Sequence, residues 1–237
     1  MSRTRLRLAY KAFGDSVKPI LRMLDDIDAE ASAALRDKAV LRKHEAIQSA
    51  AVMLLSGYIE SFLRDAAENF FEELSDTALN YSNLSWEMKL AHYLDGAKML
   101  GQIVDCERRA KSLYLPETLS AIKALLYPTS NNSPKLFWKA FAQTRSNPGP
   151  EVIKDFLRKF DIKDPLANLG TKSGYSANHI ESQLRTLIEL RNECAHTGSI
   201  KGVPSPMTIR DYIHFLRKVC YGIAKLLTER LVTMQNP

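Results

Sequence analysis

The fold of this chain is decided by residues 41–74, LRKHEAIQSAAVMLLSGYIESFLRDAAENFFEEL. Apolar residues recur there every three or four positions, at Ile47, Ala51, Leu54, Leu55, Tyr58, Phe62, Ala66 and Phe70. This spacing is that of one face of an α-helix. At ~1.5 Å per residue, the stretch predicts one helix roughly 50 Å long. Because so long a helix needs partners along its whole length, we expect it to pack against several other helices or against a second subunit.

The helical period continues on both sides of this stretch. Upstream, Asp15 or Ser16 is expected to cap a helix. Its apolar face consists of Val17, Ile20, Leu21, Leu24 and Ile27. Downstream, Asn83 or Ser85 is expected to cap a helix that reaches about Lys111. The first turns of that helix carry Trp86, Met88, Leu90, Tyr93 and Leu94.

Two further helices are predicted near the end of the sequence. Ser176 is expected to cap the first, and Ser205-Pro206 is a favourable N-cap and N1 pair for the second. The first buries Ile180, Leu184, Leu187 and Ile188. The second buries Ile209, Ile213, Leu216, Val219, Cys220, Ile223, Leu226 and Leu227. No segment alternates like a strand and no helical repeat is evident, so the fold class is predicted to be all-α.

Residues 112–175 differ from the helices on either side. Six prolines interrupt them: Pro116, Pro128, Pro134, Pro148, Pro150 and Pro165. The region is too apolar for a disordered linker, so short helices and loops are expected. We therefore predict one domain, residues 1–237, whose core is a bundle of long antiparallel helices at about 15–111 and 176–235. Residues 112–175 form an inserted helical subdomain in this interpretation.

Composition indicates a soluble globular chain with a basic surface. Of 237 residues, 45% are hydrophobic and 25% are charged, which suffices for a core. The net charge of +6 favours polyanions mildly, although a merely basic surface explains it equally well. Since acidic residues are also abundant, phosphate binding would require a local basic patch.

Cysteines and hydropathy indicate a reducing compartment. Cys106, Cys194 and Cys220 are far apart and odd in number, which predicts neither a disulfide framework nor a metal site. The basic N-terminus lacks the apolar region of a secretory signal. No run approaches the ~20 apolar residues of a membrane span. The expected location is the cytoplasm, without a membrane partner.

The stretch RNECAH, residues 191–196, ends the penultimate helix and carries the best candidate chemistry. An imidazole exchanges protons near neutral pH, and a guanidinium binds an anion through two parallel hydrogen bonds. Arg191 and His196 therefore suit phosphodiester chemistry. In a continuing helix these residues would lie about 140° apart, while Asn192 and His196 share a face. Because Gly198 favours a helix stop, we expect His196 at or beyond the helix end, turned back towards Arg191.

The same residues also have purely structural interpretations. Arg191 would then form an ion pair with Glu189 or Glu193 on a solvated face. His196 would serve as a C-terminal cap, favoured by the helix dipole. Cys194 is expected to pack under the helix rather than to react.

Three features together resemble the HEPN superfamily of helical-bundle proteins. They are Arg191-x4-His196 with Asn192 after the arginine, the long closing helix from Pro206, and the segment SGYIESFL, residues 56–63, in the early long helix. That segment is similar to branches of small standalone ribonucleases, including the RiboL-PSP type. The scaffold resemblance covers roughly residues 40–110 and 176–230.

The resemblance implies a specific activity. HEPN ribonucleases are typically homodimers in which the Arg and His of both subunits meet in one cleft. They cleave RNA without metal or cofactor: the 2′-hydroxyl attacks the phosphodiester and leaves a 2′,3′-cyclic phosphate. Many relatives act as toxins or in anti-phage defence. On this chain, Arg191 and His196 would be catalytic and Asn192 would orient the phosphate or the histidine. The implied partners are RNA, a second copy and an antitoxin or regulatory protein.

Other residues are weaker candidates. Glu60 would support the site from behind, or pair with Arg64 on the surface. Part of the basic surface of the closing helix and its approach is expected to contact RNA backbone, with a solvated face as the alternative. That surface carries Lys201, Arg210, Arg217, Lys218 and Lys225. Aromatic residues that would stack on bases, or else pack in the core, are Tyr175, Tyr212 and Tyr221.

No metal site or alternative catalytic motif is predicted. The remaining histidines stand alone in the sequence, at positions His44, His92, His179 and His214. Phosphate-binding glycine loops and nucleophile elbows are absent too. The leading hypothesis is a dimeric, metal-independent endoribonuclease. The alternatives are a non-catalytic HEPN-like module that binds or assembles with another protein, and a helical scaffold in which the motif is accidental.

Overall fold

The computed structural model describes residues 5–76, 81, 84–110, 122–123, 138–142 and 147–235, apart from the side chains of 102–104 and 106–110. Within these ranges all regular structure is helical and no strand occurs, so the all-α prediction is confirmed. The helices are α1 Arg5–Ser16, α2 Lys18–Ala29, α3 Ala31–Ala34, α4 Lys38–Ser75, α5 Trp86–Ala110, α7 Lys139–Ala142, α8 Pro150–Lys159, α9 Pro165–Ser173, α10 Ala177–Thr197 and α11 Pro206–Gln235.

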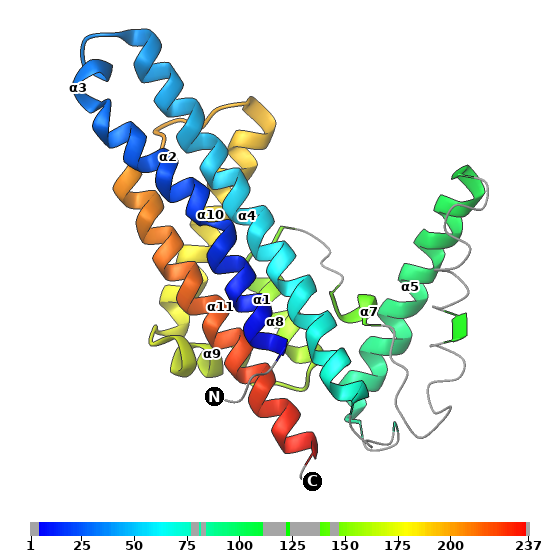
Figure 1. Cartoon of the computed structure of the whole chain (residues 1–237). Helices are drawn as coiled ribbons and strands as arrows, with labels where there is room; N and C mark the ends of the chain where they lie inside the picture. The colour runs from blue at the N-terminus through cyan, green and yellow to red at the C-terminus, as the bar shows by residue number, and fades with distance from the viewer. Residues whose placement is uncertain are drawn as a thin grey trace.

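The main bundle is built from α1, α2, α4 and α11, which lie side by side (Figure 1). The α1–α2 pair runs against the direction of α4 and α11, so α1 begins at the end of the bundle where α11 finishes (Figure 1). Helix α10 covers α4 from behind, and α9 packs on α11. Since each long helix has an apolar stripe, side-by-side packing removes all the stripes from water together.

The helix predicted to follow Asp15 or Ser16 is α2, which begins at Lys18 and is preceded by a further helix. Neither Asp15 nor Ser16 caps it: Ser16 Oγ donates to the Ala12 carbonyl, and Asp15 pairs with Lys18 at 2.7 Å. Helix α1 precedes it instead, because Leu6, Ala9 and Phe13 are buried with the same spacing. Backbone bonds continue through the junction, from Val17 N–H to the Phe13 carbonyl, and Pro19, which lacks an N–H, marks the break. The predicted face is confirmed, since Val17, Ile20, Leu24 and Ile27 are buried and Leu21 packs against the core.

Helix α4 forms as predicted and passes through the centre of the molecule. The Asp37 carboxylate caps it by accepting from Ala39 N–H at 2.7 Å. Most of its predicted stripe is buried, although Leu54 is 39% exposed. By length and composition this helix is apolar enough to cross a membrane, contrary to the expectation that no segment approaches a span. Half of that stretch is buried among the other helices, and a bundle's core helix meets the same criterion.

Helix α5 extends away from the bundle (Figure 1). Ser85 caps it, its hydroxyl accepting from Met88 N–H at 3.4 Å; Asn83, the other candidate cap, lies outside the described residues. Of the apolar residues predicted for its first turns, Met88 is buried and four are exposed: Trp86, Leu90, Tyr93 and Leu94. The Lys159 ammonium reaches across to Asp95 at 2.9 Å and fastens this helix to α8.

The described part of residues 112–175 consists of short helices, as predicted. Pro150 and Pro165 each stand in the first turn of one, while Pro116, Pro128 and Pro134 lie outside the described residues. An aromatic cluster joins α7 and α8 to the end of α4; its members are Phe70, Phe71, Phe141, Phe156 and Phe160. Helix α9 approaches α11 so closely that a Cβ on Gly222 would lie 2.8 Å from Leu169.

Both closing helices have the predicted caps. Ser176 Oγ accepts from His179 N–H at 3.2 Å, and Ser205 Oγ accepts from Thr208 N–H at 3.1 Å. All the residues predicted to be buried in α11 are buried. In α10, Ile180, Leu184 and Leu187 are buried and Ile188 is partly exposed.

Candidate functional site

The candidate site lies in the last two turns of α10, which rest on α4. The Cys194 sulfur lies 3.8 Å from the Ser49 carbonyl of α4, so this thiol packs against the neighbouring helix as expected. Gly198 ends the helix at a φ of 74°, and its N–H donates to the Cys194 carbonyl at 2.8 Å. Glycine adopts this left-handed conformation without strain, which explains the stop.

The turn after the helix is held by Glu193. Its carboxylate accepts from Lys201 N–H at 2.7 Å, just before a second left-handed glycine, Gly202 at a φ of 67°. Thr197 Oγ1 adds a bond to the Glu193 carbonyl at 2.8 Å. Glu193 is therefore engaged with the backbone and not with Arg191.

Arg191 has no carboxylate partner in the described part of the chain, so the ion pair with Glu189 or Glu193 that the structural alternative required is not formed. Its guanidinium instead donates to Asn192 Oδ1 at 3.3 Å. The same oxygen accepts from Asn147 Nδ2 at 2.8 Å. A partly exposed cation without a neutralising neighbour keeps its capacity to bind an anion.

His196 is exposed in the last turn of α10, at the helix end as predicted. Because the helix continues to Thr197, His196 does not turn back towards Arg191, contrary to expectation. The two side chains stand about 140° apart around the axis. No hydrogen bond or ion pair joins them in the described residues. One chain thus presents the guanidinium and the imidazole on different sides of one helix end.

Glu60 and Arg64 stand further along α4. Glu60 is eleven positions from Ser49, which is about 16 Å along the helix. Among described residues it has no bond to Arg191, Asn192 or His196, and its supporting role stays a prediction. The alternative pairing with Arg64 is not formed, since Arg64 contacts Ser61 Oγ at 2.9 Å and Asp65 at 3.5 Å.

The basic residues proposed for RNA are not equivalent. Arg210 pairs with Asp25 at 2.7 Å and Asp28 at 2.8 Å, so two carboxylates offset its charge. Lys218 lies 5.2 Å from the centre of the Tyr175 ring, a cation–π contact. Arg217 and Lys201 are exposed. The free positive charge on this surface is therefore carried by fewer residues than the sequence indicates.

The candidate stacking tyrosines are mostly engaged inside the protein. Tyr212 is 6% exposed, and Tyr221 packs edge-on against Tyr10. Tyr175 is partly exposed and contacts the rings of His179 and Phe215. These contacts favour the core interpretation for Tyr212.

The other histidines are spread over the molecule. His44 binds Glu30 at 3.1 Å beside a cavity of about 210 Å³ between α2 and α4. His92 is fully buried, and this burial lowers its pKa to about 4. In the described residues no three His, Cys, Asp or Glu side chains come together in a way that would hold a metal ion.

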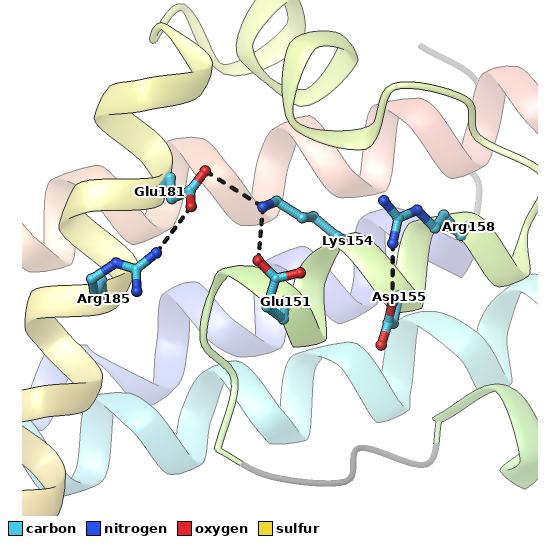
Figure 2. Close-up of polar contacts among 6 residues, drawn as sticks. All are labelled: Glu151, Lys154, Asp155, Arg158, Glu181 and Arg185. Carbon is cyan, nitrogen blue, oxygen red and sulfur yellow. Dashed lines mark hydrogen bonds and ion pairs between the residues drawn. The ribbon is translucent and has the colours of Figure 1, made fainter.

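A polar network fastens α8 to the first half of α10 (Figure 2). The Lys154 ammonium bridges Glu151 at 2.8 Å and Glu181 at 3.4 Å, and Arg185 donates to Glu181 at 3.0 Å. Hydrogen bonding to Glu151 is the main reason that the pKa of Lys154 is raised. Together with the Asn147–Asn192 bond, this network attaches the segment from 147 to 159 to both halves of α10.

Sequence reasoning missed Asn147. It lies beside turn-forming residues in the sequence, 45 positions from the residue that it contacts. The Asn-Pro-Gly-Pro pattern predicts a turn but does not say which helix the turn touches. The contact could only be found in three dimensions.

Comparisons with known proteins give one result. A family model described as RiboL-PSP-HEPN matches residues 17–229, which includes the short helices of the 112–175 region as well as the long helices. Searches of curated proteins and of solved structures found no match. The match covers most of the 237 residues and spans α10 with its Arg191–His196 motif. The chain belongs to the RiboL-PSP-HEPN family.

Proposed function

We propose that this chain is a metal-independent endoribonuclease that cleaves RNA by attack of a 2′-hydroxyl on the adjacent phosphodiester. The observation that carries the proposal is that the Arg191 guanidinium forms no ion pair with any described carboxylate. Arg191 lies in the last two turns of α10, which also contain His196. Family membership makes a nuclease or a related HEPN module the expected class.

Arg191 suits the charge that develops during cleavage. The phosphorane formed by 2′-hydroxyl attack carries more negative charge than the phosphodiester, and a fixed guanidinium stabilises that excess. The interaction is stronger with the transition state than with the substrate, which is the condition for catalysis. Arg191 is the proposed electrostatic catalyst.

His196 is the proposed acid or base. An exposed imidazole has access to substrate, and it takes the proton from the 2′-hydroxyl or gives one to the leaving 5′-oxygen. A single imidazole does one of these jobs at a time. In a dimer, the two copies of His196 would supply one general base and one general acid.

A second copy of the chain is therefore part of the proposal. Within one chain Arg191 and His196 stand on different sides of the helix end. A two-fold axis beside α10 would bring the arginine of one subunit towards the histidine of its partner, as the resemblance to HEPN ribonucleases implies. Asn192 would orient the arginine or the phosphate in that cleft.

The biological role proposed is that of a cytoplasmic toxin or anti-phage effector, restrained by an antitoxin or regulatory protein. A non-catalytic binding module is the second candidate. It is favoured by the separation of Arg191 from His196 in the single chain, because a module that only binds a partner protein needs no such pairing.

The test is cleavage of total RNA in EDTA by the wild type, by Arg191→Ala and by His196→Ala. The proposal expects cutting by the wild type only, with 2′,3′-cyclic phosphate ends. Mixing the two variants should restore part of the activity if one cleft uses residues from both subunits. Equal cutting by wild type and His196→Ala removes His196 from the mechanism, and no cutting by any protein favours the binding module.

A further inference from the structure

Asn147 and Asn192 are joined by a short hydrogen bond between distant parts of the chain. Asn147 Nδ2 donates to Asn192 Oδ1 at 2.8 Å, and Arg191 donates to the same oxygen at 3.3 Å. An amide oxygen has two lone pairs, so it accepts both donors. The side chain of Asn192 thus lies between the cation and Asn147.

The backbone that carries Asn147 is held firmly. Pro148, Gly149 and Pro150 follow it, and all three are buried. The proline rings fix φ at two of these positions. Gly149 lies against α10, where a Cβ would meet Ile188 at 3.5 Å, and its N–H donates to the Asn147 carbonyl at 2.7 Å. Asn147 therefore has a defined position relative to α10.

Helix α8 continues this attachment. Its apolar side is buried through Ile153, Phe156 and Leu157, and Lys154 on its polar side bridges to Glu181 of α10 (Figure 2). These contacts attach the whole segment from 147 to 159 to α10. A shift of this segment would therefore move the amide that binds Asn192.

A guanidinium on the surface samples many rotamers unless another group restricts it. Catalysis by a cation depends on its position, and a displacement of about 1 Å can cost on the order of 100-fold in rate. Asn192 restricts Arg191 only as long as its own amide is held. The bond from Asn147 is the one other contact of that oxygen among the described residues.

We propose that Asn147 is a positioning residue of the site: it fixes the amide of Asn192, which in turn fixes the guanidinium of Arg191. The inference rests on the proposed ribonuclease activity for its consequence, and on the two hydrogen bonds for its geometry. In this proposal, the segment from 147 to 159 determines the orientation of the Arg191 guanidinium.

The experiment is a double-mutant cycle on single-turnover RNA cleavage. The proteins are the wild type, Asn147→Ala, Asn192→Ala and the double variant, each as the full chain. We expect Asn147→Ala to lower the cleavage rate by roughly tenfold with little change in RNA affinity. In the Asn192→Ala background the same change should have no further effect, because the residue through which Asn147 acts is gone.

Two controls separate positioning from general damage. Asn168→Ala removes a matched asparagine amide bond, from Asn168 Nδ2 to the Lys163 carbonyl, away from the site and should leave cleavage unchanged. Asn147→Leu keeps the number and branching of the side-chain heavy atoms without a donor and should match Asn147→Ala. Melting temperatures measured on all variants identify any that fail to fold. If one of the two Asn147 variants does not fold, the cleavage rate of the other tests the proposal.

The proposal is overturned if Asn147→Ala cleaves as fast as the wild type, or if it lowers the rate equally in both backgrounds. A wild type that cleaves no RNA refutes the proposed function but still permits the test. The Arg191 Nε–H resonance, assigned by its loss in Arg191→Lys, is then compared between variants. Asn147→Ala should shift it and Asn168→Ala should not; an unshifted resonance in Asn147→Ala overturns the inference.

Discussion

The two halves of α10 are held in place by different forces. In the first half Ile180, Leu184 and Leu187 are completely buried, and the Ser176 cap and the network to α8 fix the start. In the second half no residue from Arg191 to Thr197 is buried, and the contacts are hydrogen bonds and one sulfur contact. The first half is anchored by burial, whereas the second leaves its polar groups wholly or partly exposed.

The largest effect should come from the exposed half and should appear in activity alone. Arg191→Ala is expected to lower RNA cleavage by about 10²–10³-fold and His196→Ala by about 10²–10⁴-fold. Because both side chains are wholly or partly exposed, the free energy of unfolding should change by no more than about 0.5 kcal/mol. Cleavage assays and denaturant unfolding on the same preparations measure both. A large stability loss would show that these residues are structural and would break the comparison.

The opposite pattern is expected in the buried half. Leu184→Ala should lower the free energy of unfolding by about 2–5 kcal/mol, because it removes apolar contacts and leaves a cavity. Leu190→Ala, at a partly exposed position of the same helix, is the control and should cost less. Denaturant titration followed by circular dichroism gives both values. Equal losses would mean that burial does not distinguish the halves.

A buried histidine should make the free energy of unfolding depend on pH, whereas an exposed histidine should not. Burial lowers the pKa of His92 to about 4, whereas an unfolded imidazole titrates near 6.5. Between these values the unfolded state binds the extra proton, so stability falls as the pH drops from about 6.5 to 4, by on the order of 2–3 kcal/mol. His92→Phe should flatten this part of the stability curve, and His214→Gln, at an exposed position, should not. A curve unchanged by His92→Phe would contradict the assignment.

The cap at the start of α10 should contribute less. Ser176→Ala removes the acceptor for His179 N–H and is expected to cost about 1 kcal/mol. Ser182→Ala, on the exposed face of the same helix, should be neutral or slightly stabilising since alanine favours helix. Thermal melts of the two variants compare cap and face directly. Similar melting temperatures would show that α10 is anchored by its apolar side alone.

The smallest effect is expected for the charged network of Figure 2. Glu181→Gln breaks its pairing with Lys154 and Arg185, yet the Glu181 side chain is 34% exposed, so the loss should be about 0.5 kcal/mol. Raising the salt concentration to about 1 M should abolish the difference from the wild type, because exposed charges are screened. A salt-independent loss would show that the network is better shielded than its exposure indicates.

Much of the bundle could be predicted because its helices carry their signals locally. Apolar periodicity gave α4, α10 and α11, and serine caps fixed the starts of α5, α10 and α11. The cap at Asp15 or Ser16 was wrong because Leu6, Ala9 and Phe13 bury a further helix against the core, which outweighs a local cap. Asp15 and Ser16 precede Pro19, and from the sequence alone such residues are compatible both with the start of a helix and with its continuation.

The site could be predicted only where its residues are neighbours in sequence. Arg191, Asn192 and His196 were proposed from their spacing and stay a prediction, while Gly198 ends the helix as predicted. Asn147 was not found, because nothing local links it to a helix 45 positions away. The charge on Arg210 was overestimated for the same reason, since Asp25 and Asp28 belong to a helix near the other end of the chain.

The central position of α4 has a consequence for biosynthesis. Its apolar face is completed by α1 from the start of the chain and by α11 from the end, with contacts such as Gln48 to the Pro204 carbonyl spanning 156 positions. Chains fold as their parts emerge from the ribosome, and distant contacts close last. The bundle closes only once residues 206–235 have been translated, so the proposed ribonuclease cannot act before α11 has left the ribosome.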